Sequence, residues 1–129
     1  MADRSKIAKR NRRAGHGYER KLAELYREAG YLDALTARNE SRTLDNCKVD
    51  IARVPFFPQA KYGYSSMSVS QYVKILTEME QLLKEHGIKD DYPLIIHHRR
   101  SRKKMEDLVI MPKKHFFKII KTNKNESTN

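Results

Sequence analysis

Cysteine and long apolar runs are scarce in this chain of 129 residues. The one cysteine, Cys47, excludes a disulfide within the chain and a zinc site built from several cysteines. The longest aliphatic run, residues 94–96, is far shorter than the roughly 20 apolar residues of a transmembrane helix. The first 17 residues have no apolar core, so we expect no secretory signal. We therefore expect a soluble protein of the cytoplasm, or of a host cell's cytoplasm if the source is viral.

Acidic residues are also few relative to basic ones. The 27 Lys and Arg residues against 16 Asp and Glu residues give a formal charge of +11 and a pI of about 9.8. A charge of this size repels itself unless an anionic partner is bound, and nucleic acid is the first candidate, ahead of an anionic membrane surface. The length suits one domain with a real hydrophobic core.

The composition changes twice along the chain. Residues 1–14 hold six basic side chains and almost nothing apolar, which predicts a flexible basic arm. Residues 15–121 carry the periodic patterns of one folded domain. The polar residues 122–129 predict a disordered tail.

Helices are predicted where apolar residues recur at helical spacing, first over residues 18–29 and again over residues 68–87. Ser68 and Gln71 fit a capping box at the start of the second helix. A last helix is expected after Pro112. The apolar face of the first helix consists of Tyr18, Leu22, Leu25, Tyr26 and Ala29, and that of the second consists of Tyr72, Ile75, Leu76, Met79, Leu82 and Leu83.

Strands are predicted between these helices from short apolar runs bounded by turn residues. The order of elements is then α-β-β-β-α-β-β-α, which predicts an α/β fold in which a central mixed sheet is flanked by helices. Pro58 indicates an edge position or a strand start. The expected strands are residues 35–38, 49–53, 57–61, 94–98 and 107–111, of which the second and third are expected to form a hairpin.

Three candidate site residues fall on the two strands of this hairpin. Because successive side chains of a strand alternate between faces, Gln59 and Lys61 must point the same way, and Asp50 can lie opposite them. The oxygens of Asp50 and Gln59 suit Mg²⁺ or Mn²⁺, which prefer oxygen ligands and retain several waters. Lys61 could assist an attacking water or neutralise charge on a phosphate. Glu19, at the border of the first helix's apolar face, can reach the same cation.

These residues resemble the pattern of the PD-(D/E)XK nuclease superfamily, in which a strand acid is followed on the next strand by Glu or Gln, any residue, and Lys. The letters "GYER" of residues 17–20 resemble the archaeal and phage-type Holliday junction resolvases of that superfamily. A helix glutamate joins the metal site in those enzymes, and Glu19 matches it. Gln59 departs from the usual carboxylate, which removes a negative charge and should weaken cation binding.

The resemblance covers residues 15–121. It implies a restriction-endonuclease-like core and a metal-dependent endonuclease that cuts branched DNA, most of all four-way junctions. Two symmetric cuts on a four-way junction require two active sites, so a homodimer is expected.

The candidate residues also have ordinary structural explanations. Asp50 could be an edge-strand acid paired with an arginine, Lys61 a solvated lysine, and Glu19 a surface glutamate. Asp45 is favoured as a turn residue over a further acid of the site. The adjacent histidines at 97–98 face opposite ways on a strand and cannot share one metal ion.

The basic residues suit a phosphate track whose affinity falls steeply with salt. No recognition-helix motif is present, so backbone and shape are the expected readout. Two other functions stay open: a noncatalytic nucleic-acid-binding module of the same fold, favoured by Gln59, and a basic RNA-binding protein. The predicted phosphate contacts are Arg10, Arg12, Arg13, Arg38, Arg42, Lys48, Arg99, Arg100, Arg102, Lys103 and Lys104.

Overall fold

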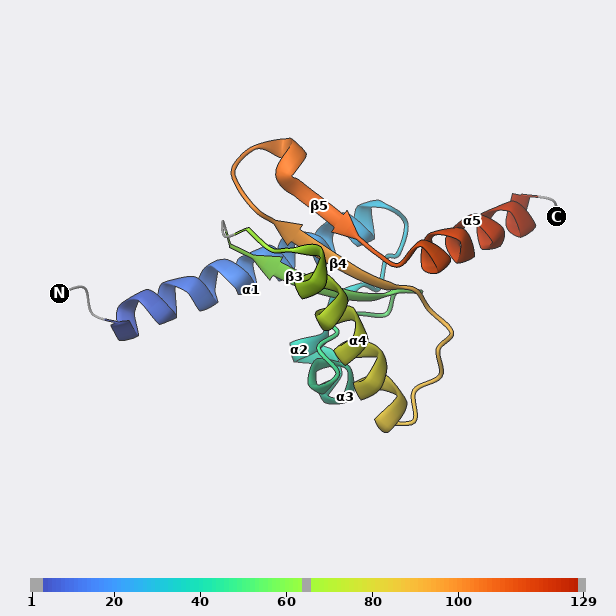
Figure 1. Ribbon diagram of the computed structural model, residues 1–129, viewed down its shortest axis with the longest axis horizontal. Coiled ribbons are helices and arrows are strands. Elements are labelled where there is room, and N and C mark those ends of the chain that lie inside the picture. Colours follow the sequence, from blue (N-terminus) through green and yellow to red (C-terminus); the bar gives the residue numbers. More distant parts are fainter. Residues whose placement is uncertain (1–3, 64–65, 128–129) are drawn as a thin grey trace.

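Helices and strands alternate along the chain in the computed structural model, which describes residues 4–63 and 66–127 (Figure 1). The α/β class and the predicted order of the main elements are confirmed, with two short helices and one 3-10 turn added. The helices are α1 (Arg4–Glu28), α2 (Ala37–Glu40), α3 (Arg42–Asn46), α4 (Val69–Glu85) and α5 (Lys113–Ser127), with the 3-10 turn at Lys104–Glu106. The strands are β1 (Leu35–Thr36), β2 (Ile51–Ala52), β3 (Phe57–Tyr62), β4 (Leu94–Arg99) and β5 (Asp107–Ile110).

The described strands form two sheets instead of the one expected. The larger sheet has the order β3-β4-β5 and is mixed, because β3 runs parallel to β4 while β5 runs antiparallel to it. Its register places Lys61 beside His98. The smaller sheet is an antiparallel pair of β1 and β2. The edge position predicted from Pro58 is confirmed, since β3 is an outer strand of the larger sheet.

The predicted hairpin between residues 49–53 and 57–61 is wrong. Strand β2 is only two residues long and pairs with β1, not with β3. Lys48 and Arg53 have left-handed backbones, with φ values of 66° and 64°, and a strand cannot continue through either of them. One backbone hydrogen bond, from the Asp50 nitrogen to the Pro58 oxygen at 2.7 Å, links this region to β3.

Two apolar clusters pack on opposite faces of the larger sheet. Helix α4 covers one face, where Met79 and Ile96 are fully buried, and its predicted capping box is present. Helix α1 covers the other face, where Leu22 is buried. Leu25 was expected in the core but is 45% exposed, and it lines an open groove between α1 and β5.

The two adjacent histidines of β4 face opposite sides, as predicted. The Nε2 atom of His97 lies 2.7 Å from the Tyr26 hydroxyl of α1. The Nδ1 atom of His98 lies 2.6 Å from the Tyr72 hydroxyl of α4. These contacts join each helix to the same strand.

The segments predicted as irregular are partly helical. Residues 4–14 extend α1 toward the N-terminus, and α5 continues through residues 122–127 of the predicted tail. The flexibility of either segment stays a prediction. The strand expected at residues 35–38 ends after Thr36, where α2 begins, and α2 and α3 replace the polar loop expected at residues 39–46. No described helix combines the length and apolar character that crossing a membrane requires.

Candidate functional site

Asp50 lies at the exposed edge of β3 and holds it at two points. Its backbone nitrogen donates to the Pro58 oxygen, and its carboxylate Oδ2 accepts a hydrogen bond from the Ala60 nitrogen, both at 2.7 Å. The carbonyl of residue 58 and the N–H of residue 60 point out of the same edge of a strand, where a neighbouring strand would otherwise bind them. The Asp50 side chain therefore substitutes for the missing hairpin partner, and its position is fixed by backbone.

Burial raises the pKa of the Asp50 carboxyl from its ordinary value of 3.8 to about 7. The hydrogen bond from the Ala60 N–H opposes this rise, while the charges of Glu19 and Asp45 add to it and the charge of Lys61 opposes it. An acid with this pKa is readily neutralised by a proton or by a cation at neutral pH.

Glu19 is brought to this site by the packing of α1. The preceding residue, Tyr18, is buried and donates a hydrogen bond to Asp107 of β5 at 2.7 Å. Burial raises the pKa of Glu19, and the nearby Arg38 guanidinium opposes that rise. The two side chains form an ion pair at 3.7 Å, in which Glu19 is 17% exposed. Glu19 is thus a half-buried acid of the site and not a fully solvated surface residue.

Arg38 was predicted as a DNA contact, and the structure places it in an ion pair with Glu19. Helix α2 begins at Ala37, whose backbone nitrogen donates a hydrogen bond to the backbone carbonyl oxygen of Asp50 at 2.7 Å. The next residue, Arg38, therefore lies beside the site. The Nε atom of Arg38 is buried and has no hydrogen-bond partner among the described residues. Its guanidinium supplies positive charge next to Glu19.

Asp45, for which a plain turn role was favoured, lies in the first turn of α3 and raises the pKa of both Glu19 and Asp50. No pattern in the sequence indicated this placement, because α3 lies in a segment that was expected to be a loop. The proximity of Asp45 depends on the chain folding back through α2 and α3.

Gln59 and Lys61 lie on the face of β3 opposite Ala60, which packs against the α1 cluster. Gln59 is 7% exposed, and its Oε1 atom is buried without a hydrogen-bond partner among the described residues. A buried carbonyl oxygen without a donor is costly, and such groups in folded proteins usually have a partner such as a water or an ion. Lys61 is half-buried beside His98, whose Nε2 lies 3.2 Å from the Gly63 carbonyl oxygen.

The oxygen atoms of the candidate residues are of the kind that a hard divalent cation prefers, but there are few of them. Among the described residues, no three His, Cys, Asp or Glu side chains are grouped closely enough to hold a metal ion. Mg²⁺ needs only one or two carboxylates and retains several waters. Asp50 and Glu19 could supply those carboxylates, and the unpartnered Oε1 of Gln59 could supply a neutral oxygen. Lys61 could not be a ligand when charged, but its ammonium group could contact a phosphate.

The predicted phosphate contacts fall into two groups. Lys48 pairs with Glu78 at 3.8 Å, and Arg99 pairs with Asp107 at 3.4 Å. Arg100 is half-buried and donates to the Ser66 hydroxyl at 3.0 Å. The exposed members of the set that form no ion pair with a described residue, and so are available to an anion from solvent, are Arg10, Arg12, Arg13, Arg42, Arg102, Lys103 and Lys104.

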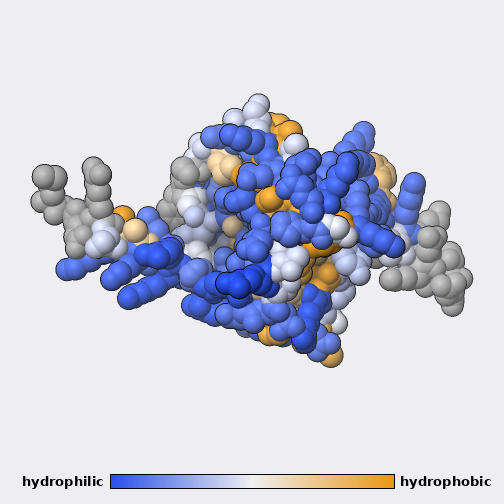
Figure 2. All heavy atoms as spheres, turned by 90° about the horizontal axis from the view of Figure 1, so that it is seen from below, coloured by the Kyte–Doolittle hydropathy of each residue, from blue (hydrophilic) through white to orange (hydrophobic). Residues whose placement is uncertain are grey.

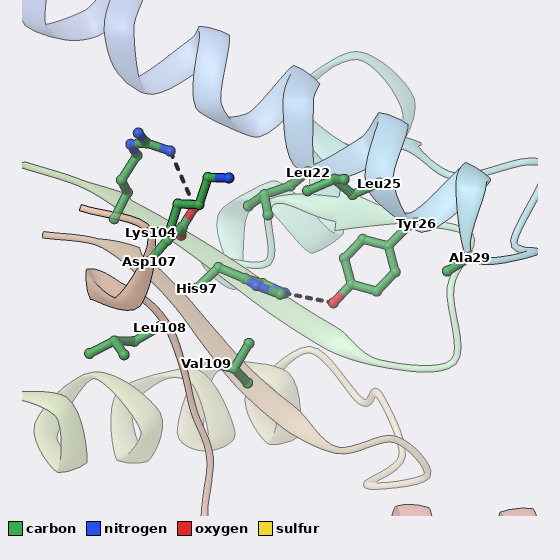
Figure 3. Close-up of a pocket in the computed structure, with 10 residues that line it drawn as sticks. Leu22, Leu25, Tyr26, Ala29, His97, Lys104, Asp107, Leu108 and Val109 are labelled. Atoms are coloured by element: carbon green, nitrogen blue, oxygen red, sulfur yellow. Dashed lines mark hydrogen bonds and ion pairs between the residues drawn. The ribbon is translucent and has the colours of Figure 1, made fainter. Parts of the chain in front are cut away.

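A separate cavity of about 540 Å³ lies between α1 and strands β4 and β5 (Figure 3). Leu22, Leu25 and Val109 give it apolar walls, and the hydrogen-bonded pair of Tyr26 and His97 forms its polar side. Burial lowers the pKa of His97 to about 4, so its ring is neutral at neutral pH. None of the four predicted catalytic residues is among the residues that line this cavity.

Comparisons with protein-family models, with curated proteins and with solved structures gave no match to this chain.

Proposed function

We propose that this protein is a metal-dependent endonuclease that hydrolyses phosphodiesters in branched DNA, in the manner of a Holliday junction resolvase with a restriction-endonuclease-like core. The observation that carries the proposal is the Asp50 carboxylate, which is fixed on the edge of β3 by the Ala60 N–H and whose pKa is raised by burial. This partly buried acid belongs to a chain of formal charge +11, which suits a polyanionic substrate.

Asp50 and Glu19 would hold Mg²⁺ or Mn²⁺, with Gln59 as a neutral ligand. A bound divalent cation supplies Lewis acidity toward a phosphoryl oxygen and lowers the pKa of water. Lys61, two residues beyond Gln59 on the same face of β3, would neutralise charge that develops on the phosphate. Arg38 would release Glu19 to the cation and could then contact a phosphate oxygen.

The purified protein, incubated with labelled DNA, tests the proposal. We expect cleavage of a four-way junction in Mg²⁺ or Mn²⁺, none with a chelator, and weaker cutting of a linear duplex of the same sequence. Structured RNA at the same salt concentration is the control for an RNA-binding function. Absence of cation-dependent cleavage of every DNA substrate would contradict the proposal.

A noncatalytic nucleic-acid-binding module of the same fold is the second candidate, and two observations favour it. Gln59 carries no charge where the resembled enzymes have a carboxylate, and Arg38 already neutralises Glu19. The Gln59→Glu variant separates the two functions. A nuclease should change its cleavage rate or its preference between Mg²⁺ and Mn²⁺, whereas a noncatalytic module should bind junctions and stay inactive with both cations.

A further inference from the structure

The N-terminal half of α1 is a protruding basic helix that directly precedes the candidate site. Residues 4–17 include six basic side chains and no acidic one. This half of α1 extends beyond the body of the molecule, and the side chains of residues 5–13 are exposed (Figure 1). Hydrophilic side chains line much of the protruding end and continue onto the body (Figure 2). The same helix carries Glu19 into the site.

Most of these charges lie on one face of the helix. Spacings of three, four, seven and fourteen residues from Lys6 bring side chains to the same face. The exposed residues at these positions are named here the basic stripe. Its members are Lys6, Lys9, Arg10, Arg13 and Arg20, and none of them forms an ion pair with a described acidic residue.

The stripe is destabilising in the isolated protein, because like charges three and four residues apart on a helix repel each other. A polyanion aligned with the helix would relieve this repulsion. A membrane surface fits less well, since a helix that lies on a membrane needs an apolar face. Ile7 is the one large apolar residue within residues 4–17.

We infer that the basic stripe lies along the phosphate backbone of a duplex arm on one side of the cleaved phosphate. This inference rests on the proposed function, because Glu19 fixes the place of that phosphate. From Lys6 to Arg20 the helix rises about 21 Å, at about 1.5 Å per residue, which matches about six base pairs at about 3.4 Å each. The substrate would then need double-stranded DNA over this distance, and a single-stranded flap would not suffice.

The test is junction binding in chelator as a function of salt, which requires no catalysis. The stripe variant replaces Lys6, Lys9, Arg10 and Arg13 with Gln and leaves Arg20, beside Glu19, unchanged. The control variant makes the same change at four exposed lysines of α4 and α5, so that both variants fall from a formal charge of +11 to +7 by losing four charges. The control positions are Lys74, Lys84, Lys113 and Lys121.

The stripe variant should lower the slope of log affinity against log salt by about 3 to 4, since each phosphate contact contributes about 0.9. Over a fourfold rise in salt, the parent should then lose roughly 100-fold more affinity than the stripe variant. The control variant should stay close to the parent. Equal slopes for the parent and the stripe variant, or an equal loss in the control, would overturn the inference.

A photo-crosslinker on Lys9→Cys gives an independent readout, because the native Cys47 is fully buried. Lys9 precedes Glu19 by ten residues, or about 15 Å of helix, so crosslinks should map to duplex about four base pairs from the cut phosphate. Crosslinks at scattered positions, or none on duplex arms, would also overturn the inference. Failure of the proposed function would be seen separately, as absence of cation-dependent cleavage by the parent.

Discussion

Asp50 combines a structural and a chemical role in one side chain. Its carboxylate takes the place of a strand partner for Ala60, while its charge is destabilised by burial and by Glu19. A protein built only for stability would gain by replacing this acid with a neutral residue that accepts the same hydrogen bond. Ionisable groups with strongly shifted pKa values of this kind are typical of functional sites.

The raised pKa of Asp50 makes stability depend on pH. The folded protein holds this proton with a pKa of about 7, against an ordinary value of 3.8, so the folded state binds the proton more tightly than the unfolded state. The contribution of the Asp50 carboxyl to the free energy of unfolding is therefore fully present below about pH 4 and is lost as the pH rises to about 7.

Asp50→Asn keeps an acceptor for the Ala60 N–H but cannot ionise. In chelator, the variant should be more stable than the parent at about pH 8 by up to about 4 kcal/mol, and the gain should vanish at about pH 4. Urea denaturation of both proteins at the two pH values measures this difference. A gain of the same size at both pH values would show that the negative charge of Asp50 does not destabilise the folded protein.

At the scale of elements, local patterns predicted the helices well and the strand pairing poorly. The face of α4 and its capping box depend on residues within a few positions of each other, and both are confirmed. The pairing of β2 depends on the left-handed backbone conformations of Lys48 and Arg53, because these limit the length of the strand. The pattern of apolar residues does not indicate such conformations. The hairpin was wrong for this reason, although Asp50 still reaches β3.

The candidate site was predicted in part. Side-chain alternation correctly placed Gln59 and Lys61 on one face of β3. Glu19 comes from α1, which packs on the other face, and it is half-buried in an ion pair with Arg38. The role of Arg38 beside Glu19 could not be predicted, since α2 replaced an expected strand end. Contacts between distant segments decided these details.

The capping box of α4 gives a prediction at the same scale. The Ser68 hydroxyl accepts a hydrogen bond from the Gln71 nitrogen at 3.2 Å, and the Gln71 side chain accepts one from the Ser68 nitrogen at 2.7 Å. Ser68→Ala should lower the free energy of unfolding by about 1 kcal/mol, because the first turn of α4 loses an acceptor. Ser70→Ala, at an exposed position two residues into the helix, is the matched control and should change stability by less than about 0.5 kcal/mol in urea denaturation. Equal losses in the two variants would exclude the cap.

At the scale of the whole molecule, the described residues form one copy of the candidate site, and a four-way junction requires two cuts. We predict that the 15.2 kDa chain sediments at about twice this mass, as a homodimer with two sites. A monomer at micromolar concentration, both free and bound to a junction, would contradict this prediction.

Mixed dimers test whether the two sites act separately. Dimers that contain one parent chain and one Asp50→Asn chain should nick a single strand of the junction, while parent dimers cut both. The ratio of nicked to doubly cut product, measured as the variant fraction increases, distinguishes these outcomes. Double cuts by the mixed dimers at the parent's rate would show that one site performs both.

The most direct test of the central claim is cleavage and binding by Asp50→Asn beside the parent on the same labelled four-way junction. With Mg²⁺, cleavage should fall by at least about a hundredfold, because the fixed carboxylate of the cation site is lost. In chelator, junction affinity should stay within about threefold, because it depends on the basic surface. Cleavage at the parent's rate by this variant would contradict the account.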